Sequence, residues 1–99
     1  MVYTSGVIPV DPATGNIAEG VEAQAEQAFK NLCNLVEESG SKVENIIKTT
    51  VFIKEMNDFG TINEIYKKYF KEPFPARSCV EVARLPKDVL LEVEAIAFK

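Results

Sequence analysis

The sequence contains no histidine, and only two of its 99 residues, Cys33 and Cys79, are cysteine. Histidine and closely spaced cysteines are the usual protein ligands of transition metals, so only carboxylates remain for that purpose. A cysteine nucleophile activated by a neighbouring histidine is excluded as well. We therefore expect chemistry that uses no metal, no cofactor and no covalent nucleophile.

Positive charge is also scarce, because 11 lysines and arginines face 15 acidic residues and give a net charge of −4. This balance provides no long-range attraction to nucleic acid or to an anionic membrane. No apolar run approaches the roughly 20 residues that span a bilayer, and no signal-peptide pattern follows Met1. The two cysteines lie far apart, unlike those of a secreted disulfide scaffold. We expect a cytoplasmic protein with neither nucleic acid nor membrane as partner.

The length of 99 residues and the hydrophobic content of 46% suffice for one compact domain, and residues 1–99 show no linker, repeat or low-complexity tract. A domain of this size has a thin core, for which self-association is a common remedy.

Two segments show helical spacing of apolar residues. The first spans about residues 21 to 39, where Gly40 is a typical C-terminal residue. The second begins after a capping residue at Asn57 or Asp58 and ends before Pro73 and Pro75. The apolar stripes comprise Val21, Ala25, Ala28, Phe29, Leu32, Leu35 and Val36 in the first helix, and Phe59, Ile62, Ile65, Tyr66, Tyr69 and Phe70 in the second.

The remaining segments predict strands. Residues 2–10 are rich in β-branched side chains but interrupted by Ser5-Gly6, which suits an edge strand or two short strands. Residues 43–54 predict a long strand, and residues 77–84 and 89–98 predict an antiparallel hairpin. The resulting order predicts an α+β sandwich in which two helices cover one face of a mixed or antiparallel sheet.

The predicted hairpin places Arg77, Cys79 and Glu81 on the open face of the sheet, with Ser78, Val80 and Val82 under the helices. If Val82 pairs with Leu91, Glu81 lies opposite Glu92, which is an unfavourable like-charge pair. Apolar residues of the last strand share this face with the acids, as expected for a subunit interface that contains a few polar groups.

The segment PARSCVEVARLP at residues 75–86, followed by LEVEAIA at 91–97, closely resembles the RidA (YjgF) family of enamine/imine deaminases. YTSGVIPVDPATGNI and KTTVFIKEMNDFGTINEIYKKYF are also similar to family segments, so the resemblance covers essentially the whole chain. It implies a chorismate-mutase-like α+β fold and a homotrimer with pockets at the subunit interfaces. The implied activity is that of a 2-iminobutanoate/2-iminopropanoate deaminase, which hydrolyses reactive 2-imino and enamino acids to 2-oxo acids and ammonia.

The resemblance also implies roles for six residues. Arg77 would bind the substrate carboxylate, which matches its planar fork of donors. Glu92 would position or activate the attacking water. The implied ligand contacts are Cys79, Ser5, Gly6 and Asn63.

Plainer interpretations of the same residues remain open. Arg77 can be a solvated strand residue or pair with Glu94, and Ser5-Gly6 can be a simple β-bulge. Asn63 on a helix is usually just exposed. We interpret Glu81 and Glu94 as surface charges.

The chain departs from the family pattern at its start. Relatives usually carry an earlier Gly-Pro-Tyr-Ser element, whereas this sequence begins just before YTSG, and Val7 stands where relatives often have glutamine. A pocket-closing tyrosine is therefore expected to be missing. Two other functions remain as alternatives: a catalytically silent ligand-binding or regulatory trimer, and an RNA-acting translation inhibitor, which the acidic balance disfavours.

Overall fold

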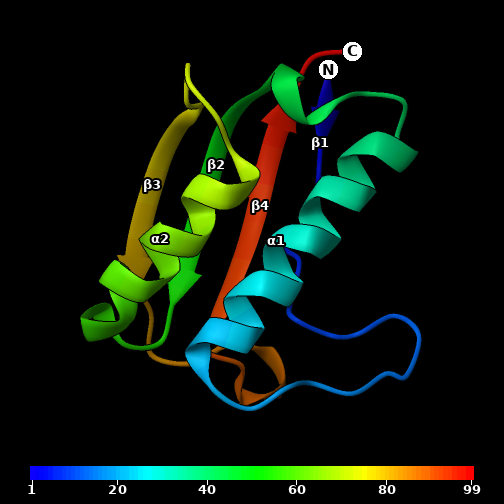
Figure 1. The fold of residues 1–99 in the computed structure, drawn as a ribbon. Coiled ribbons are helices and arrows are strands. Elements are labelled where there is room, and N and C mark those ends of the chain that lie inside the picture. The colour runs from blue at the N-terminus through cyan, green and yellow to red at the C-terminus, as the bar shows by residue number, and fades with distance from the viewer.

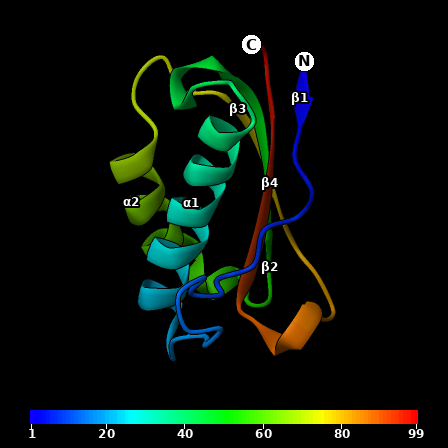
Figure 2. The same ribbon diagram turned by 90° about the vertical axis from the view of Figure 1, so that its right-hand side faces the viewer.

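The computed structural model describes all 99 residues, Met1 to Lys99. Two α-helices lie side by side on one face of a four-stranded sheet, and the other face carries no α-helix (Figures 1 and 2). This confirms the predicted α+β fold. Neither helix is both long and apolar enough to cross a membrane. The elements are β1 (Val2–Tyr3), α1 (Val21–Glu38), β2 (Ile46–Ile53), α2 (Phe59–Tyr69), β3 (Ala76–Glu81) and β4 (Leu91–Ala97).

The strands follow the order β1-β4-β2-β3 across the sheet, so the predicted hairpin between the last two strands is wrong. β2 lies between them, antiparallel to β4 and parallel to β3. The cause is α2, which returns the chain across the sheet and makes β2, α2 and β3 a parallel crossover unit. Residues 82–90 then pass beneath the end of β2 to reach β4 (Figure 1).

The like-charge pair inferred from the hairpin does not form. Glu81 aligns with Ile53 on β2, and its Oε1 accepts a hydrogen bond of 2.7 Å from the backbone N–H of Met56. Glu92 aligns with Phe52, on the other side of β2. The two carboxylates therefore have separate surroundings.

The strand faces are as predicted for β4 but reversed for β3. Leu91, Val93, Ala95 and Ala97 of β4 are buried beneath the helices. On β3, Arg77 aligns with the buried Thr49 of β2 and Cys79 aligns with the buried Val51, so both face the helix layer. Val80 lies on the open face and is 44% exposed. The prediction that Ser78 and Val80 lie under the helices is wrong, and Val82, placed with them, lies beyond the end of β3.

The core fills the space between the helices and the sheet. Phe29 of α1 is fully buried, and its ring meets those of Tyr66 and Phe70 edge-on. α1 ends as predicted, because Gly40 has a φ of +94° and donates to the carbonyl of Glu37. Leu35 departs from the prediction, since it is exposed on the outer side of α1.

The N-terminal segment lies along the outer edge of β4 in two short pieces, as one of the two predicted arrangements has it. Val2 and Tyr3 pair with Ala97 and Ile96. The chain then leaves the strand and returns at Val7, whose N–H and carbonyl both bond to Val93, at 2.7 and 3.0 Å. Residues 5 and 6 form the exposed part of this bend.

Candidate active site

Arg77 is held against α2 by three side chains of that helix. Its Nη1 donates a hydrogen bond of 2.6 Å to Oδ1 of Asn63. The guanidinium carbon lies 4.8 Å from the ring centre of Tyr66 and 5.2 Å from that of Phe59. These distances fall within the range of cation–π contacts. An arginine on an edge strand thereby has a defined orientation.

Arg77 also lines a pocket of about 330 Å³ between the edge of the sheet and the second helix. Its other lining residues are Asn63, Tyr66, Lys67, Phe74 and Pro75. Two of the lining side chains are cationic and none is acidic. The Nε and Nη2 groups of Arg77 have no protein partner. The pocket is therefore suited to a small anion such as a carboxylate.

Cys79 follows Arg77 on the same face of β3 and packs against the core. Burial raises the pKa of its thiol, although the nearby Arg77 acts in the opposite direction. The thiol is thus protonated at neutral pH, which makes it a poor nucleophile. The expected contact between Cys79 and a bound ligand remains a prediction.

Glu92 lies on the open face of the sheet, where its carboxylate rests directly against the backbone of Gly6. A Cβ added to Gly6 would come within 1.9 Å of Glu92 Oε2. Only glycine allows this approach. Ser5 precedes Gly6 in the same exposed bend, so these two residues and Glu92 form one group.

The six predicted site residues therefore form two groups that do not meet within one chain. Asn63, Arg77 and Cys79 lie on the helix side of the sheet at its β3 edge. Glu92 and the bend at residues 5 and 6 lie on the open side, at or beyond β4, and β2 separates the two groups. The prediction that Arg77 and Glu92 share one face is wrong.

The sequence analysis missed the role of Phe59, Tyr66 and Lys67 around Arg77. Phe59 and Tyr66 were assigned to the inward stripe of α2, where they do lie, with Asn63 between them on the adjoining face. The spacing of four and then three residues between Phe59, Asn63 and Tyr66 places all three side chains along one side of the helix. This spacing could have indicated that they contact the same group. The spacing identifies Arg77 as that group only when β3 is known to lie beside β2 and under α2.

For the imine hydrolysis that the sequence resemblance implies, Gly6→Ala is expected to lower turnover by about 10- to 100-fold, because the new methyl group must displace the Glu92 carboxylate. Steady-state kinetics on the folded variant measures this effect. Gly60→Ala is the matched control, since a Cβ there meets nothing within 4 Å. Equal kinetics for wild type and Gly6→Ala would show that the carboxylate position is unimportant.

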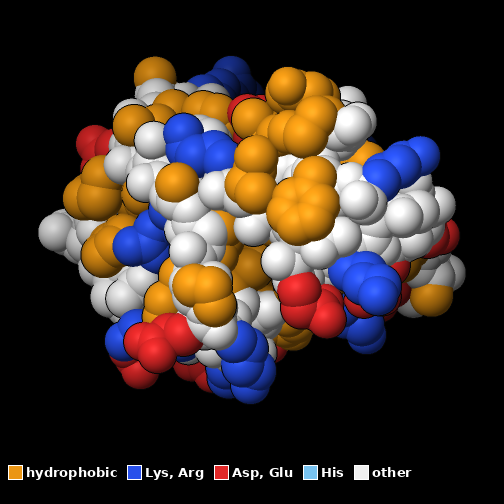
Figure 3. Space-filling view, turned by 90° about the horizontal axis from the view of Figure 1, so that it is seen from above, with side chains coloured by type: hydrophobic (Ala, Val, Ile, Leu, Met, Phe, Trp, Pro, Cys, Tyr) orange, Lys and Arg blue, Asp and Glu red, His pale blue; other side chains and the backbone are white.

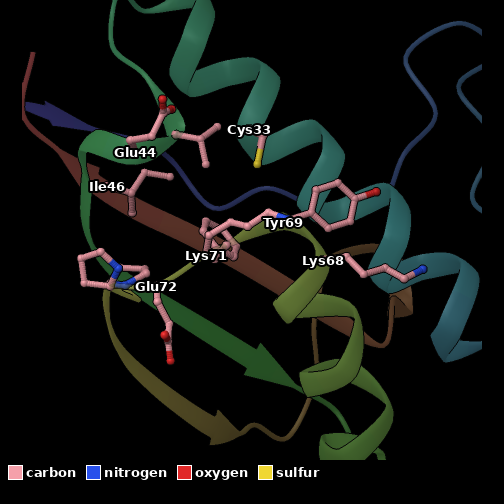
Figure 4. Close-up of a pocket in the computed structure, with 11 residues that line it drawn as sticks. Cys33, Glu44, Ile46, Lys68, Tyr69, Lys71 and Glu72 are labelled. Atoms are coloured by element: carbon pink, nitrogen blue, oxygen red, sulfur yellow. The ribbon is translucent and has the colours of Figure 1, made fainter.

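A second pocket, of about 460 Å³, lies on the other side of residues 71–75 (Figure 4). Cys33 points into it from α1, while the carboxylates of Glu44 and Glu72 point outward. Lys68 at its rim is paired with Glu26. Burial, assisted by Glu37, raises the pKa of the Cys33 thiol to about 11. The one thiol that faces this pocket is therefore not a thiolate nucleophile at neutral pH.

At pH 8, Cys33 is expected to react with iodoacetamide about 100-fold more slowly than an ordinary thiol. A pKa of about 11 in place of 9.0 lowers the thiolate fraction by that factor, and the thiolate is the reactive form. Peptide mass spectrometry after timed alkylation measures the rate, with the urea-unfolded chain as the reference. Similar rates in the folded and unfolded chains would contradict the shifted pKa.

No three histidine, cysteine, aspartate or glutamate side chains cluster as metal ligands do. Together, the fold and the site define a small α+β protein with an arginine-based anion pocket at one edge of its sheet and a glycine-backed glutamate on the opposite face.

Comparisons with known proteins agree with this description. The sequence profile of the family described as Endoribonuclease L-PSP matches residues 1–99. A 2-iminobutanoate/2-iminopropanoate deaminase of Salmonella typhimurium (strain LT2) is 60% identical over 102 aligned positions, which cover 100% of this chain and 80% of the relative. The chain belongs to this family, which is the RidA (YjgF) family that its sequence resembles.

Solved structures give the same result. Escherichia coli TdcF with bound serine superposes with a TM-score of 0.93 at 54% identity, covering 98% of this chain and 79% of TdcF. The YjgF gene product of E. coli superposes with a TM-score of 0.92 at 55% identity, covering 98% and 79% of the two chains.

Proposed function

We propose that the protein hydrolyses 2-imino acids and their enamine tautomers to 2-oxo acids and ammonia. In this reaction the oxygen of water bonds to the imine carbon, the carbon–nitrogen bond breaks, and the nitrogen leaves as ammonia. The observation that carries the proposal is the orientation of Arg77, whose free Nε and Nη2 groups line an anion pocket that contains no acidic side chain.

Two comparisons support this assignment. The Salmonella relative, at 60% identity, is named for the deamination of 2-iminobutanoate and 2-iminopropanoate. TdcF, with nearly the same fold, binds serine. Serine carries a carboxylate beside a nitrogen-bearing carbon, as a 2-imino acid does.

In the proposed mechanism Arg77 holds the substrate carboxylate through two parallel hydrogen bonds. Such bonds contribute about 1.5 to 3 kcal/mol when sheltered, whereas exposed ion pairs contribute about 0 to 1 kcal/mol. Arg77 is exposed in the single chain. The site therefore needs a cover, and a second copy of the chain is the cover we propose.

Glu92 would orient the attacking water and accept its proton. The carbon of a protonated imine is already electrophilic, so orientation and proton transfer are the main requirements, and a positioned base contributes about 10² to 10⁴ in rate. The contact with Gly6 supports this role, because it fixes where the carboxylate lies.

Because Arg77 and Glu92 lie on opposite sides of β2, we propose that two chains build each site, in a homotrimer with three interface sites. Large apolar residues on the open face and at the molecule's edges support association, among them Tyr3, Val80 and Phe98, which are 70%, 44% and 47% exposed. Figure 3 shows hydrophobic side chains gathered at the end of the molecule that carries both termini. The cytoplasmic location expected from the sequence is part of this proposal.

The activity is tested by generating 2-iminobutanoate freshly in solution and measuring ammonia and 2-oxobutanoate release against the uncatalysed rate. We expect acceleration by the wild-type protein and a trimer mass by light scattering. A trimer that binds 2-oxobutanoate without accelerating the reaction would be the silent ligand-binding protein considered as an alternative.

A mixing experiment tests whether two chains share each site. Co-expressed Arg77→Ala and Glu92→Gln chains, in equal amounts, should give about a quarter of the wild-type activity, because one interface in four combines two intact halves. The matched control mixes wild type with the double variant. If each site lies within one chain, the first mixture is inactive and the control retains about half of the activity.

A further inference from the structure

We infer that Phe59, Asn63 and Tyr66 form a platform that fixes the plane and the free edge of the Arg77 guanidinium, and that they are positioning residues for substrate binding. The kinetic consequence rests on the proposed function, whereas the structural part stands without it. The three residues are called the guanidinium platform below.

The two aromatic rings of the platform both lie within cation–π distance of the guanidinium. The guanidinium carbon is 5.2 Å from the ring centre of Phe59 and 4.8 Å from that of Tyr66. A planar, weakly hydrated guanidinium stacks well on aromatic rings, whereas a compact ammonium group does not. The rings therefore restrict a side chain that would otherwise sample many rotamers at the edge of the sheet.

The Tyr66 ring is itself held in place by contacts in the core. Its hydroxyl lies 2.6 Å from Oγ1 of the fully buried Thr49, and its ring packs against Phe29 and Phe70 at centre distances of 5.5 and 4.4 Å. Thr49 is also the residue of β2 that aligns with Arg77. The core thus fixes both the backbone that carries Arg77 and the ring against which it rests.

Asn63 determines which edge of the guanidinium remains free. Its Oδ1 accepts from Nη1 at 2.6 Å, which leaves the Nε and Nη2 donors without a protein partner. These two N–H groups point the same way and match the two oxygens of a carboxylate. The inference changes the expected role of Asn63 from contacting the substrate to orienting the residue that does.

A platform of this kind should act mainly on binding. If Arg77 is ordered before the ligand arrives, less side-chain freedom is lost when the carboxylate binds. Loss of one ring should therefore raise KM, and the dissociation constant of a 2-oxo acid, with little change in kcat.

The test uses Phe59→Leu, because Phe59 is only partly buried and the variant is expected to fold. Binding of 2-oxobutanoate, measured by calorimetry, should weaken by about 10-fold. Phe59→Tyr, which retains a ring, should bind as tightly as wild type. The matched control is Tyr69→Leu, which removes a ring from the same helix on the side that faces Glu26.

A readout independent of binding is the NMR signal of the Arg77 Nε–H group. In wild type it should show a ring-current shift, which Phe59→Leu should reduce and Tyr69→Leu should leave in place. A purely structural role for Phe59 would lower the melting temperature but leave this signal and the 2-oxobutanoate affinity unchanged, and that outcome overturns the inference. If wild type shows the signal but hydrolyses no imine, the proposed function fails and the platform stands.

Discussion

Arg77→Ala is expected to lower kcat/KM for 2-iminobutanoate by about 100- to 1000-fold, the largest effect on substrate binding of any single change in the chain. Removing one partner of a sheltered, hydrogen-bonded charge pair costs about 3 to 4 kcal/mol, and each 1.4 kcal/mol is a factor of ten. The fold should survive, because the Arg77 side chain is exposed in the single chain and the core does not depend on it.

Ammonia release and circular dichroism on the same preparation measure the two parts of this expectation. Arg77→Lys should recover only a small part of the activity, since an ammonium group cannot offer two parallel donors or stack on Tyr66. Arg84→Ala is the matched control, because Arg84 is an exposed arginine paired with Asp88. Wild-type kinetics for Arg77→Ala would show that the carboxylate binds elsewhere.

Glu92→Gln is expected to lower kcat by about 10² to 10⁴ while KM changes little. The amide keeps the size of the carboxylate against Gly6 but cannot accept a proton from water. Single-turnover kinetics with freshly generated imine separates this effect from product release.

Glu94→Gln is the control for Glu92, because Glu94 lies two residues further along β4 on the same face. Its kinetics should match those of wild type. If Glu92→Gln and Glu94→Gln behave alike, the face has an electrostatic role only, and the base must be sought among other groups.

The sequence alone was sufficient to predict the helices and the faces of β4. Each of these elements buries one face only, and its apolar residues repeat clearly along that face. Leu91, Val93 and Ala95 alternate with polar residues, and periodicity of two assigns them correctly to the core. The C-terminus of α1 was equally predictable, because Gly40 adopts the positive φ that such a position requires.

The pairing of β3 was not predictable by the same reasoning. Residues 85–88 look like a hairpin turn, and local sequence carries no information about a third strand inserted between two neighbours. β3 is also mostly exposed, so its alternation lacks the apolar contrast that would reveal its inner face. The wrong pairing also led to two further errors. These are the reversed faces of β3 and the shared face predicted for Arg77 and Glu92.

The site residues came from the resemblance, whereas their arrangement came from the fold. Asn63 accepts a hydrogen bond from Arg77, and its expected contact with the ligand stays a prediction.

The placement of Arg77 and Glu92 on opposite sides of β2 has a consequence for a newly synthesised chain. In this arrangement, such a chain carries only the proposed carboxylate-binding arginine or only the proposed proton acceptor at any one place. Catalytic activity would then begin at assembly, and dilution below the dissociation constant of the assembly should abolish activity without unfolding the chain.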